Sequence, residues 1–268
     1  MVALTDASGV RLAVTRPPRR IVSLIPSTTE TLCALGLADA LVGVTNYCRE
    51  PADVVRTKTR IGGEKDPDLE AILALHPDLV IANVEENEAA HVTALRARGI
   101  PVWVTYPRTV ADAIRMIREL GELTGTAARA ATIADDCDAM LARVSAEAAE
   151  RRARRVFYAI WREPWMTVGR DTYIHDMLRV CGGANVFADR AERYPTVTLD
   201  DVAAREPDVI LLPDEPYRFR RAHVSEFAVY DHVPAVRDRR IHLVDGKPFS
   251  WHGPRIAEAL RTLPRLFA

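Results

Sequence analysis

The sequence lacks the features that mark membrane-spanning and nucleic-acid-binding proteins. No apolar run approaches the ~20 residues that a membrane-spanning helix requires. The 36 basic and 37 acidic residues leave a formal net charge of −1, so no broad basic face is expected for nucleic acid or an anionic membrane. Direct membrane insertion and nucleic-acid binding are therefore not expected.

Cysteine is scarce, and its spacing indicates neither a zinc site nor a disulfide framework. The four cysteines are Cys33, Cys48, Cys137 and Cys181, and none forms a Cys-x-x-Cys pair. The phosphate-loop, dinucleotide, nucleophile-elbow and zinc-protease motifs are also missing. We therefore expect no catalytic residues, no intrinsic cofactor and no metal centre.

The first 20 residues lack the uninterrupted apolar stretch of a secretory signal, because Asp6, Arg11 and Arg16 divide every candidate run. The sequence as written predicts either a cytoplasmic protein or an exported protein without its leader.

Hydrophobic patterning predicts an α/β fold. Short β-branched apolar runs at 20–25, 41–45, 78–82 and 100–104 alternate with helical patterns, and strand signals return at 155–161, 209–212 and 241–244. Ser27-Thr28-Thr29-Glu30 predicts a capping box at the first helix. The expected architecture is two Rossmann-like lobes with central parallel sheets, an N-terminal lobe at 1–108, a helical connection at 109–154 and a C-terminal lobe at 155–268.

The middle of the connection predicts one long helix. Residues 126–152 are rich in alanine and contain neither proline nor glycine, and Ile133, Cys137 and Met140 recur at helical spacing. Such a helix would be about 40 Å long at 1.5 Å per residue. Two ordinary helices with an unmarked break are the alternative.

An internal duplication supports the two-lobe interpretation. Residues 69–81 align without a gap to residues 199–211. In both segments a short helix begins with an acidic residue, ends before a Pro-Asp pair, and is followed by a buried strand. The opening strands at 20–22 and 155–157 also correspond. The alternative is chance similarity between two helix-Pro-Asp-strand segments.

Two such lobes would place a cleft at the carboxyl ends of their strands, where open α/β sheets bind ligands. Aromatic residues gather there, which suits a bulky, flat or apolar ligand. The alternative is that some of the tryptophans only close the cores of the lobes. The predicted ligand contacts are Tyr47, Arg49, Glu85, Asn87 and Tyr106 in the first lobe, and Trp161, Trp165, Tyr194, Phe249, Trp251 and His252 in the second.

Glu70 and Asp200 occupy matched positions in the duplicated segments. Each lies in the first turn of a helix, where the helix dipole alone favours a carboxylate. Their symmetry also suits two equivalent basic sites on a two-fold partner.

Several segments resemble the class III periplasmic solute-binding proteins that serve ABC importers of cobalamin, haem and ferric siderophores. Residues 19–30, 35–36 and 42–45 are similar to the N-terminal lobe of that family, most closely to its cobalamin-binding members, which belong to the helical backbone metal receptor superfamily. The resemblance extends over roughly residues 19–265. The further similar segments are 47–51, 61–63, 69–82, 181–185 and 253–256.

The resemblance implies a non-enzymatic receptor whose lobes are joined by one long helix. It implies that Tyr47, Trp165 and Tyr194 lie near positions that contact the corrin, and that Glu70 and Asp200 dock onto arginines of the permease dimer. Lys247, Phe249 and Trp251 stand where cobalamin binders present an aspartate and an arginine.

The function expected from this resemblance is capture of a cobalamin-like, haem-like or ferric-chelate ligand and its delivery to an ABC importer. A monomer is expected, located in the periplasm or cell envelope. Two alternatives remain at this point, a cytosolic binder or sensor on the same scaffold and a two-lobed transferase.

Overall fold

The computed structural model describes residues 2–268, which form two compact units. The first unit contains the chain up to Pro107, Ala111–Cys137 and His252–Pro254. The second contains Arg108–Val110, Asp138–Trp251 and Arg255–Ala268. The predicted helical connection at 109–154 is thus divided between the two units. Among residues 2–268, no helix has both the length and the apolar character needed to cross a membrane.

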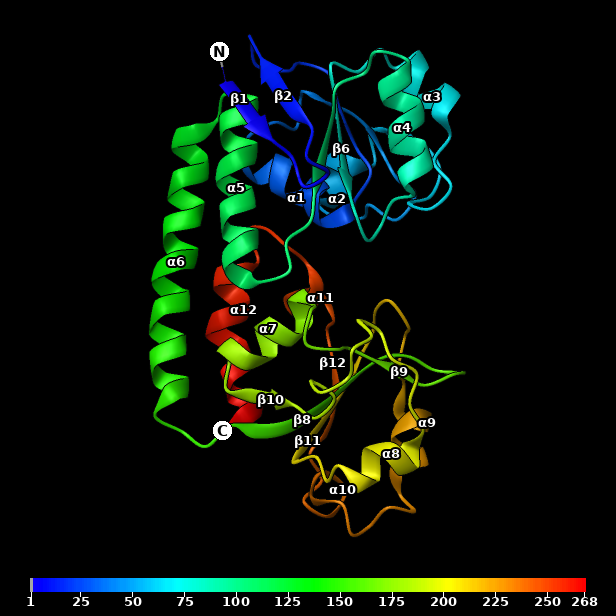
Figure 1. The fold of residues 1–268 in the computed structure, drawn as a ribbon, viewed down its shortest axis with the longest axis vertical. Coiled ribbons are helices and arrows are strands. Elements are labelled where there is room, and N and C mark those ends of the chain that lie inside the picture. Colours follow the sequence, from blue (N-terminus) through cyan, green and yellow to red (C-terminus); the bar gives the residue numbers. More distant parts are fainter. Residues whose placement is uncertain (1) are drawn as a thin grey trace. The chain divides into compact units, whose positions relative to one another are not determined.

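The first unit is built on a five-stranded sheet in which every pairing is parallel (Figure 1). The strand order is β5 (Thr59–Arg60), β4 (Leu41–Val44), β3 (Ile21–Ser23), β6 (Leu79–Asn83) and β7 (Val102–Thr105). Strands β3, β6 and β7 are wholly buried, as their continuous apolar runs predict. The helices that alternate with the strands are α1 (Pro26–Ala34), α2 (Ala52–Val55), α3 (Leu69–Ala74) and α4 (Ala89–Ala97).

The first helix corrects one expectation. The predicted capping box at Ser27-Thr28-Thr29-Glu30 does not form, because α1 already begins at Pro26 with Ile25 as its N-cap and without a side-chain cap. Proline has the fixed φ that the first helical position requires and no N–H to satisfy, so it starts the helix ahead of the polar residues.

The second unit has a parallel sheet of strand order β10 (Gly183–Asn185), β8 (Arg154–Trp161), β11 (Val209–Pro213) and β12 (Ile241–Val244). The short strand β9 (Met166–Thr167) pairs antiparallel with β8. In Figure 1, α7 (Tyr173–Val180) and α12 (Ile256–Thr262) lie on one side of this sheet, while α8 (Leu199–Ala204) and α10 (Pro234–Arg237) lie on the other. Three shorter helices complete the unit, α9 (Arg221–Val224), α11 (Lys247–Ser250) and a 3₁₀ turn at Ser225–Phe227, and a second 3₁₀ turn, Leu263–Phe267, ends the chain.

The two sheets repeat one topology, which supports the duplication. The order β4-β3-β6-β7 corresponds to β10-β8-β11-β12. The matched aspartates also bond alike, since Asp78 accepts from the Arg20 amide at 2.9 Å and Asp208 accepts from the Arg155 amide at 2.8 Å. In both copies the residue before proline leaves the right-handed helix, since that conformation is disfavoured there, and His76 and Glu206 have φ values of 45° and 41°.

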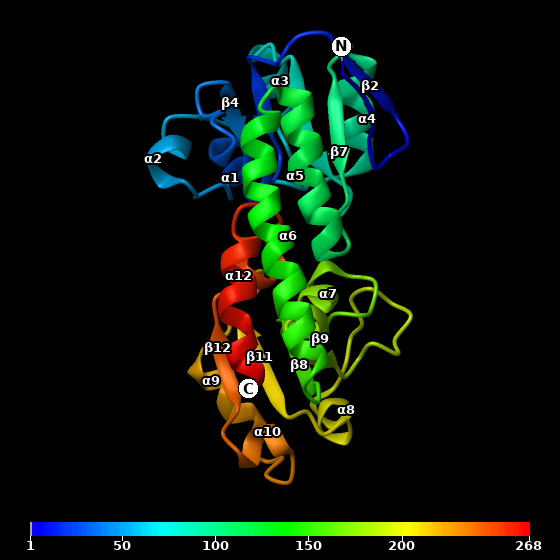
Figure 2. The ribbon, with the colours of Figure 1, turned by 90° about the vertical axis from the view of Figure 1, so that its left-hand side faces the viewer.

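The central helical segment forms α5 (Val110–Thr124) and α6 (Ala127–Ala149). Helix α6 is one uninterrupted helix of 23 residues, which confirms the single-helix prediction and excludes a break. Its first turns run beside α5 (Figure 2), and the contact needs Gly121, because a Cβ there would lie 2.2 Å from the Cβ of Ala130.

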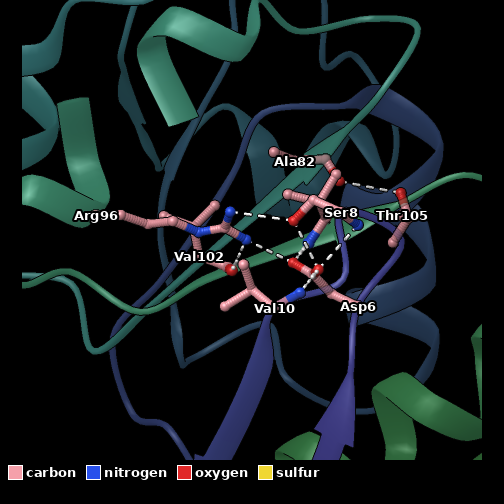
Figure 3. A network of polar contacts seen from close by, with 8 residues as sticks. Asp6, Ser8, Val10, Ala82, Arg96, Val102 and Thr105 are labelled. Atoms are coloured by element: carbon pink, nitrogen blue, oxygen red, sulfur yellow. Dashed lines mark hydrogen bonds and ion pairs between the residues drawn. The ribbon is translucent and has the colours of Figure 1, made fainter. Parts of the chain in front are cut away.

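An N-terminal hairpin, β1 (Val2–Thr5) and β2 (Arg11–Val14), was not predicted. Its turn is held to the first unit by Asp6, whose buried carboxylate accepts hydrogen bonds from the Val10 amide at 3.0 Å and the Val104 amide at 3.1 Å (Figure 3). The Arg96 guanidinium pairs with the same carboxylate at 2.5 Å. The hairpin is therefore fixed by contacts with α4 and β7, which are distant in the sequence.

Candidate functional site

The parallel topology places the predicted contacts of the first unit at the carboxyl edge of its sheet. Tyr47 and Arg49 follow β4, and both are exposed, with 59% of the Tyr47 surface accessible. Glu85 and Asn87 follow β6, and Tyr106 follows β7. Because strands β4, β6 and β7 run parallel, the loops that carry these residues lie at one edge of the sheet.

Asn87 differs from its neighbours because it is only 5% exposed and its amide is engaged. Its oxygen accepts from the Asn83 amide at 2.8 Å, and its nitrogen donates to the Leu24 carbonyl at 3.3 Å and the Glu64 carbonyl at 3.0 Å. The Asn87 amide therefore links the loop after β6 to the backbone at Leu24 and Glu64. Lys65 adds a further tie by donating to the Glu85 carbonyl.

Aromatic side chains cluster at the carboxyl ends of β8 and β11 in the second unit. Trp165 stacks on Phe219 with ring centroids 5.4 Å apart and meets the edge of Phe227 at 5.5 Å. It is half-buried and packs against the core, so the core-closing alternative describes part of its surface. Trp161 is 42% exposed and meets the edge of Tyr217 at 5.5 Å.

The loop between Trp161 and Trp165 is held by charge pairs. The guanidinium of Arg162 donates to Glu226 at 2.9 Å and pairs with Glu163 at 2.5 Å. The first of these pairs ties the loop to the 3₁₀ turn at Ser225–Phe227.

Tyr194 lies in the loop between β10 and α8 and is 39% exposed. The guanidinium of Arg193 stands 5.8 Å from its ring centroid and also bonds Asp171 at 2.7 Å. Tyr194 therefore presents accessible aromatic surface, as Tyr47 and Trp161 do.

The three predicted contacts near the C-terminus have different surroundings. Phe249 is fully buried and packs against Tyr158, with centroids 5.1 Å apart, so its ring belongs to the core. Trp251 is half-buried, with Arg255 and Lys247 at 5.3 and 6.0 Å from its ring centroid. The carbonyl of His252 accepts from the Thr31 hydroxyl at 3.4 Å within the first unit. Desolvation lowers the pKa of His252 to about 4, so its imidazole is neutral at physiological pH.

Tyr217 and Glu215 belong to the same edge but were not among the predicted contacts. Both follow β11, and this placement after a buried strand is the signal that could have identified them. Glu215 is half-buried, and the Trp251 indole donates to its carboxylate. Burial is the main cause that raises the pKa of Glu215.

The two matched acids lie on exposed helix starts. Glu70 has 82% of its side chain exposed and stands 3.7 Å from the Arg98 guanidinium. Asp200 is exposed and accepts from the Tyr230 hydroxyl at 2.7 Å. The capping of α8 is performed by Thr198 and Asp201, so the Asp200 carboxylate is not the one that closes the helix start.

Within residues 2–268, none of the four cysteines takes part in a disulfide bond. The Cys48 sulfur is buried 3.2 Å from the hydroxyls of both Thr29 and Thr45. Across residues 2–268, no group of three or more histidine, cysteine or acidic side chains is arranged to hold a metal ion.

Comparisons with known proteins give one consistent family. The family described as periplasmic binding protein matches residues 21–248. The vitamin B12-binding protein of Vibrio parahaemolyticus is 30% identical over 194 residues, which cover 72% of this chain and 70% of that protein.

Solved structures show the same fold over almost the whole chain. The periplasmic haem-binding protein from Roseiflexus sp. RS-1 matches with a TM-score of 0.82 and 27% identity, over 93% of this chain and 97% of that one. A protein of an ABC-type Fe3+-hydroxamate transport system from Saccharomonospora viridis matches with a TM-score of 0.77 and 25% identity, over 99% and 98% of the two chains.

Proposed function

Since this chain belongs to the periplasmic binding protein family, we propose that it is a receptor that captures a bulky metal chelate and delivers it to an ABC importer. The ligand classes are corrinoids, haem and ferric chelates, which are transported cargo and leave no intrinsic cofactor in the protein. The names of the compared proteins support this range, because they refer to vitamin B12, haem and Fe3+-hydroxamate. The receptor acts as a monomer in the periplasm or cell envelope and performs no catalysis.

The observation that carries the proposal is the accessible aromatic surface at the strand ends. Tyr47, Trp161 and Tyr194 keep 59, 42 and 39% of their surfaces accessible, although large aromatic side chains usually bury most of theirs. Flat macrocycles gain affinity by stacking on such rings, and a few polar groups then set their orientation. We propose that these three residues, with Trp165 and Trp251, contact the ligand, and that Arg49, Glu85, Tyr106 and His252 contribute polar groups.

We propose that Asn87 and Phe249 affect the site indirectly, by positioning the residues that contact the ligand. Asn87 holds the loops of the first unit, and Phe249 packs beneath the strand ends of the second. Their substitution would therefore change ligand affinity through the positions of other residues.

The direct test is a binding screen of the purified protein with cyanocobalamin, dicyanocobinamide, haemin and a ferric hydroxamate. Absorbance and tryptophan fluorescence should report binding of at least one of them at micromolar or tighter affinity, equivalent to roughly 8 kcal/mol. Trp161→Ala should weaken that binding at least about tenfold, because stacked aromatic residues are frequent hot spots. Tyr230→Ala is the control and should leave ligand affinity unchanged, because Tyr230 bonds Asp200 on α8 and is not among the proposed ligand contacts. A protein that binds none of these probes would refute the proposal.

Glu70 and Asp200 are proposed to dock the receptor onto basic residues of the permease dimer. Exposed acids at equivalent positions of duplicated units suit a two-fold partner. The double charge reversal Glu70→Lys, Asp200→Lys should abolish ligand uptake by cells that carry the importer while ligand affinity stays unchanged. A loss of ligand affinity in this variant would place the two acids in the ligand site instead.

A further inference from the structure

The loops after β11 and β12 bring a compact group of charged residues together in the second unit. These strands pair in parallel with Pro213 opposite Val244, so Asp214 and Glu215 lie beside Asp245 and Gly246. The Gly246 amide donates to the Asp214 carboxylate at 3.0 Å. A Cβ on Gly246 would lie 2.7 Å from the Glu215 Cγ, so glycine is what permits this close approach.

Two of the three acids in this group accept hydrogen bonds from neighbouring backbone amides. Asp214 accepts from Gly246, and Asp245 accepts from the Lys247 amide at 3.0 Å and the Lys247 ammonium at 3.3 Å. Glu215 is held instead by the Trp251 indole, and the Ser250 hydroxyl, which lies 3.5 Å from its carboxylate, shares its hydrogen with the Gly246 carbonyl at 3.0 Å. Because a carboxylate has about four lone-pair positions, Glu215 can accept further donors from a ligand.

Tyr158 gives an independent sign that hydrogen-bonding capacity remains here. Its side chain is fully buried in β8, and among the described residues its hydroxyl has no hydrogen-bond partner. Burial and then the charges of Glu215, Asp214 and Asp245 raise the pKa of this hydroxyl well above its ordinary value. The three acids therefore act on the same buried hydroxyl.

Two cations stand near the three acids, and Lys247 lowers the pKa of Glu215, so they offset the negative potential in part. Lys247 is paired with Asp245, and the Arg255 guanidinium lies over the ring of Trp251. The three carboxylates still outnumber the two cations, so a ligand that reached Glu215 would meet a hydrogen-bond acceptor in an acidic group, beside the Trp251 ring.

We propose that Glu215 determines ligand specificity, by accepting a hydrogen bond from an N–H or O–H group on the ligand rim and by disfavouring carboxylates there. This inference rests on the proposed receptor function and narrows its ligand class. It selects chelates whose rim carries amides or hydroxyls, such as corrinoids, over dicarboxylate porphyrins. A carboxylate on the ligand would be repelled by the like charge of Glu215 in a partly desolvated site. A ligand without an N–H or O–H donor would leave the Glu215 acceptor unsatisfied, which costs free energy of binding.

The test compares two probes, dicyanocobinamide with amide side chains and haemin with two carboxylates, on the full chain. Dissociation constants are measured by fluorescence titration for the wild type, Glu215→Gln and the control Glu258→Gln, which alters an exposed acid on α12. The wild type should prefer dicyanocobinamide, and Glu215→Gln should reduce the preference about tenfold by admitting haemin, as expected when one like-charge repulsion is removed. Glu258→Gln should keep the wild-type preference.

A second variant guards against misfolding. Glu215→Asp keeps the charge but withdraws the acceptor, so it should weaken dicyanocobinamide binding while haemin stays excluded. Wild-type preference for haemin, or an unchanged preference in folded Glu215→Gln, would overturn selection by Glu215 and leave the receptor function standing. A wild type that binds neither these probes nor a ferric hydroxamate would overturn the receptor function, and the role of Glu215 with it.

Discussion

Replacing Asp6 with asparagine should destabilise the first unit by about 3 kcal/mol. The Asp6 side chain is 1% exposed, and one of its carboxylate oxygens accepts from both Arg96 and the Val104 amide. Asparagine would either present an NH2 group to these two donors or turn it toward the donors of Ser8 and Val10.

The magnitude follows from the bonds that are lost. Removing one member of a buried ion pair costs roughly 3–5 kcal/mol, and the lower end applies because 25% of the Arg96 side chain remains exposed. A loss of about 3 kcal/mol corresponds to a fall in Tm of roughly 6–12 °C for a chain of this size.

Urea unfolding followed by circular dichroism measures the change, with Asp39→Asn, an exposed acid of the same unit, as the matched control. Hydrogen exchange should show faster exchange of the hairpin amides at 2–14 in Asp6→Asn. A double-mutant cycle with Arg96→Met isolates the pair, and the coupling should be at least about 1 kcal/mol for residues in direct contact. A loss below about 0.5 kcal/mol in Asp6→Asn, within the usual range for surface substitutions, would refute the reasoning.

Three further predictions concern the cores and the duplicated turns. Tyr158→Phe removes a buried hydroxyl that has no partner among the described residues, so urea unfolding should show unchanged stability or a gain of about 1 kcal/mol, and a clear loss would contradict this. Burial raises the pKa of Cys181 to about 12 from 9.0 in the unfolded chain, so from pH 9 upward the unfolded state releases its proton first and stability falls by up to about 1.4 kcal/mol per pH unit. Urea unfolding between pH 8 and about pH 10.5 should show a shallower fall in Cys181→Ala, and equal slopes would count against a buried neutral thiol. Asp78→Asn and Asp208→Asn should each cost about 1 kcal/mol in thermal unfolding, because both carboxylates hold the start of a neighbouring strand, and a neutral result for only one would show that the turns are not equivalent.

The regular elements could be predicted because their signals are local. Buried strands such as β6 and β11 are continuous apolar runs that follow a helix-ending Pro-Asp, and the structure has both. Helix α6 was predicted as one helix because no proline or glycine interrupts its pattern. The start of α1 was wrong because two local signals competed, and proline at the first helical position prevailed over the polar capping pattern.

The N-terminal hairpin could not be predicted from its own residues. Its strands are short and partly exposed, and the turn is held by Arg96 and Val104, far along the chain. No periodicity within residues 2–14 contains that information.

The candidate site was predictable only as a set of loops. The order of strands and the duplication identified the carboxyl edges, and Tyr47, Trp161 and Tyr194 do present accessible rings there. Neither signal distinguished Phe249, which is buried against Tyr158, from an exposed ring.

The sequence by itself determined the α/β alternation, the duplicated units and the long helix, because each depends on residues a few positions apart. Only the tertiary structure decided which loop residues are accessible, which are engaged in packing, as Asn87 and Phe249 are, and which neighbours Glu215 has. The physical reason is that burial and hydrogen bonding depend on side chains that are far apart in the chain and meet only when β8, β11 and β12 pair.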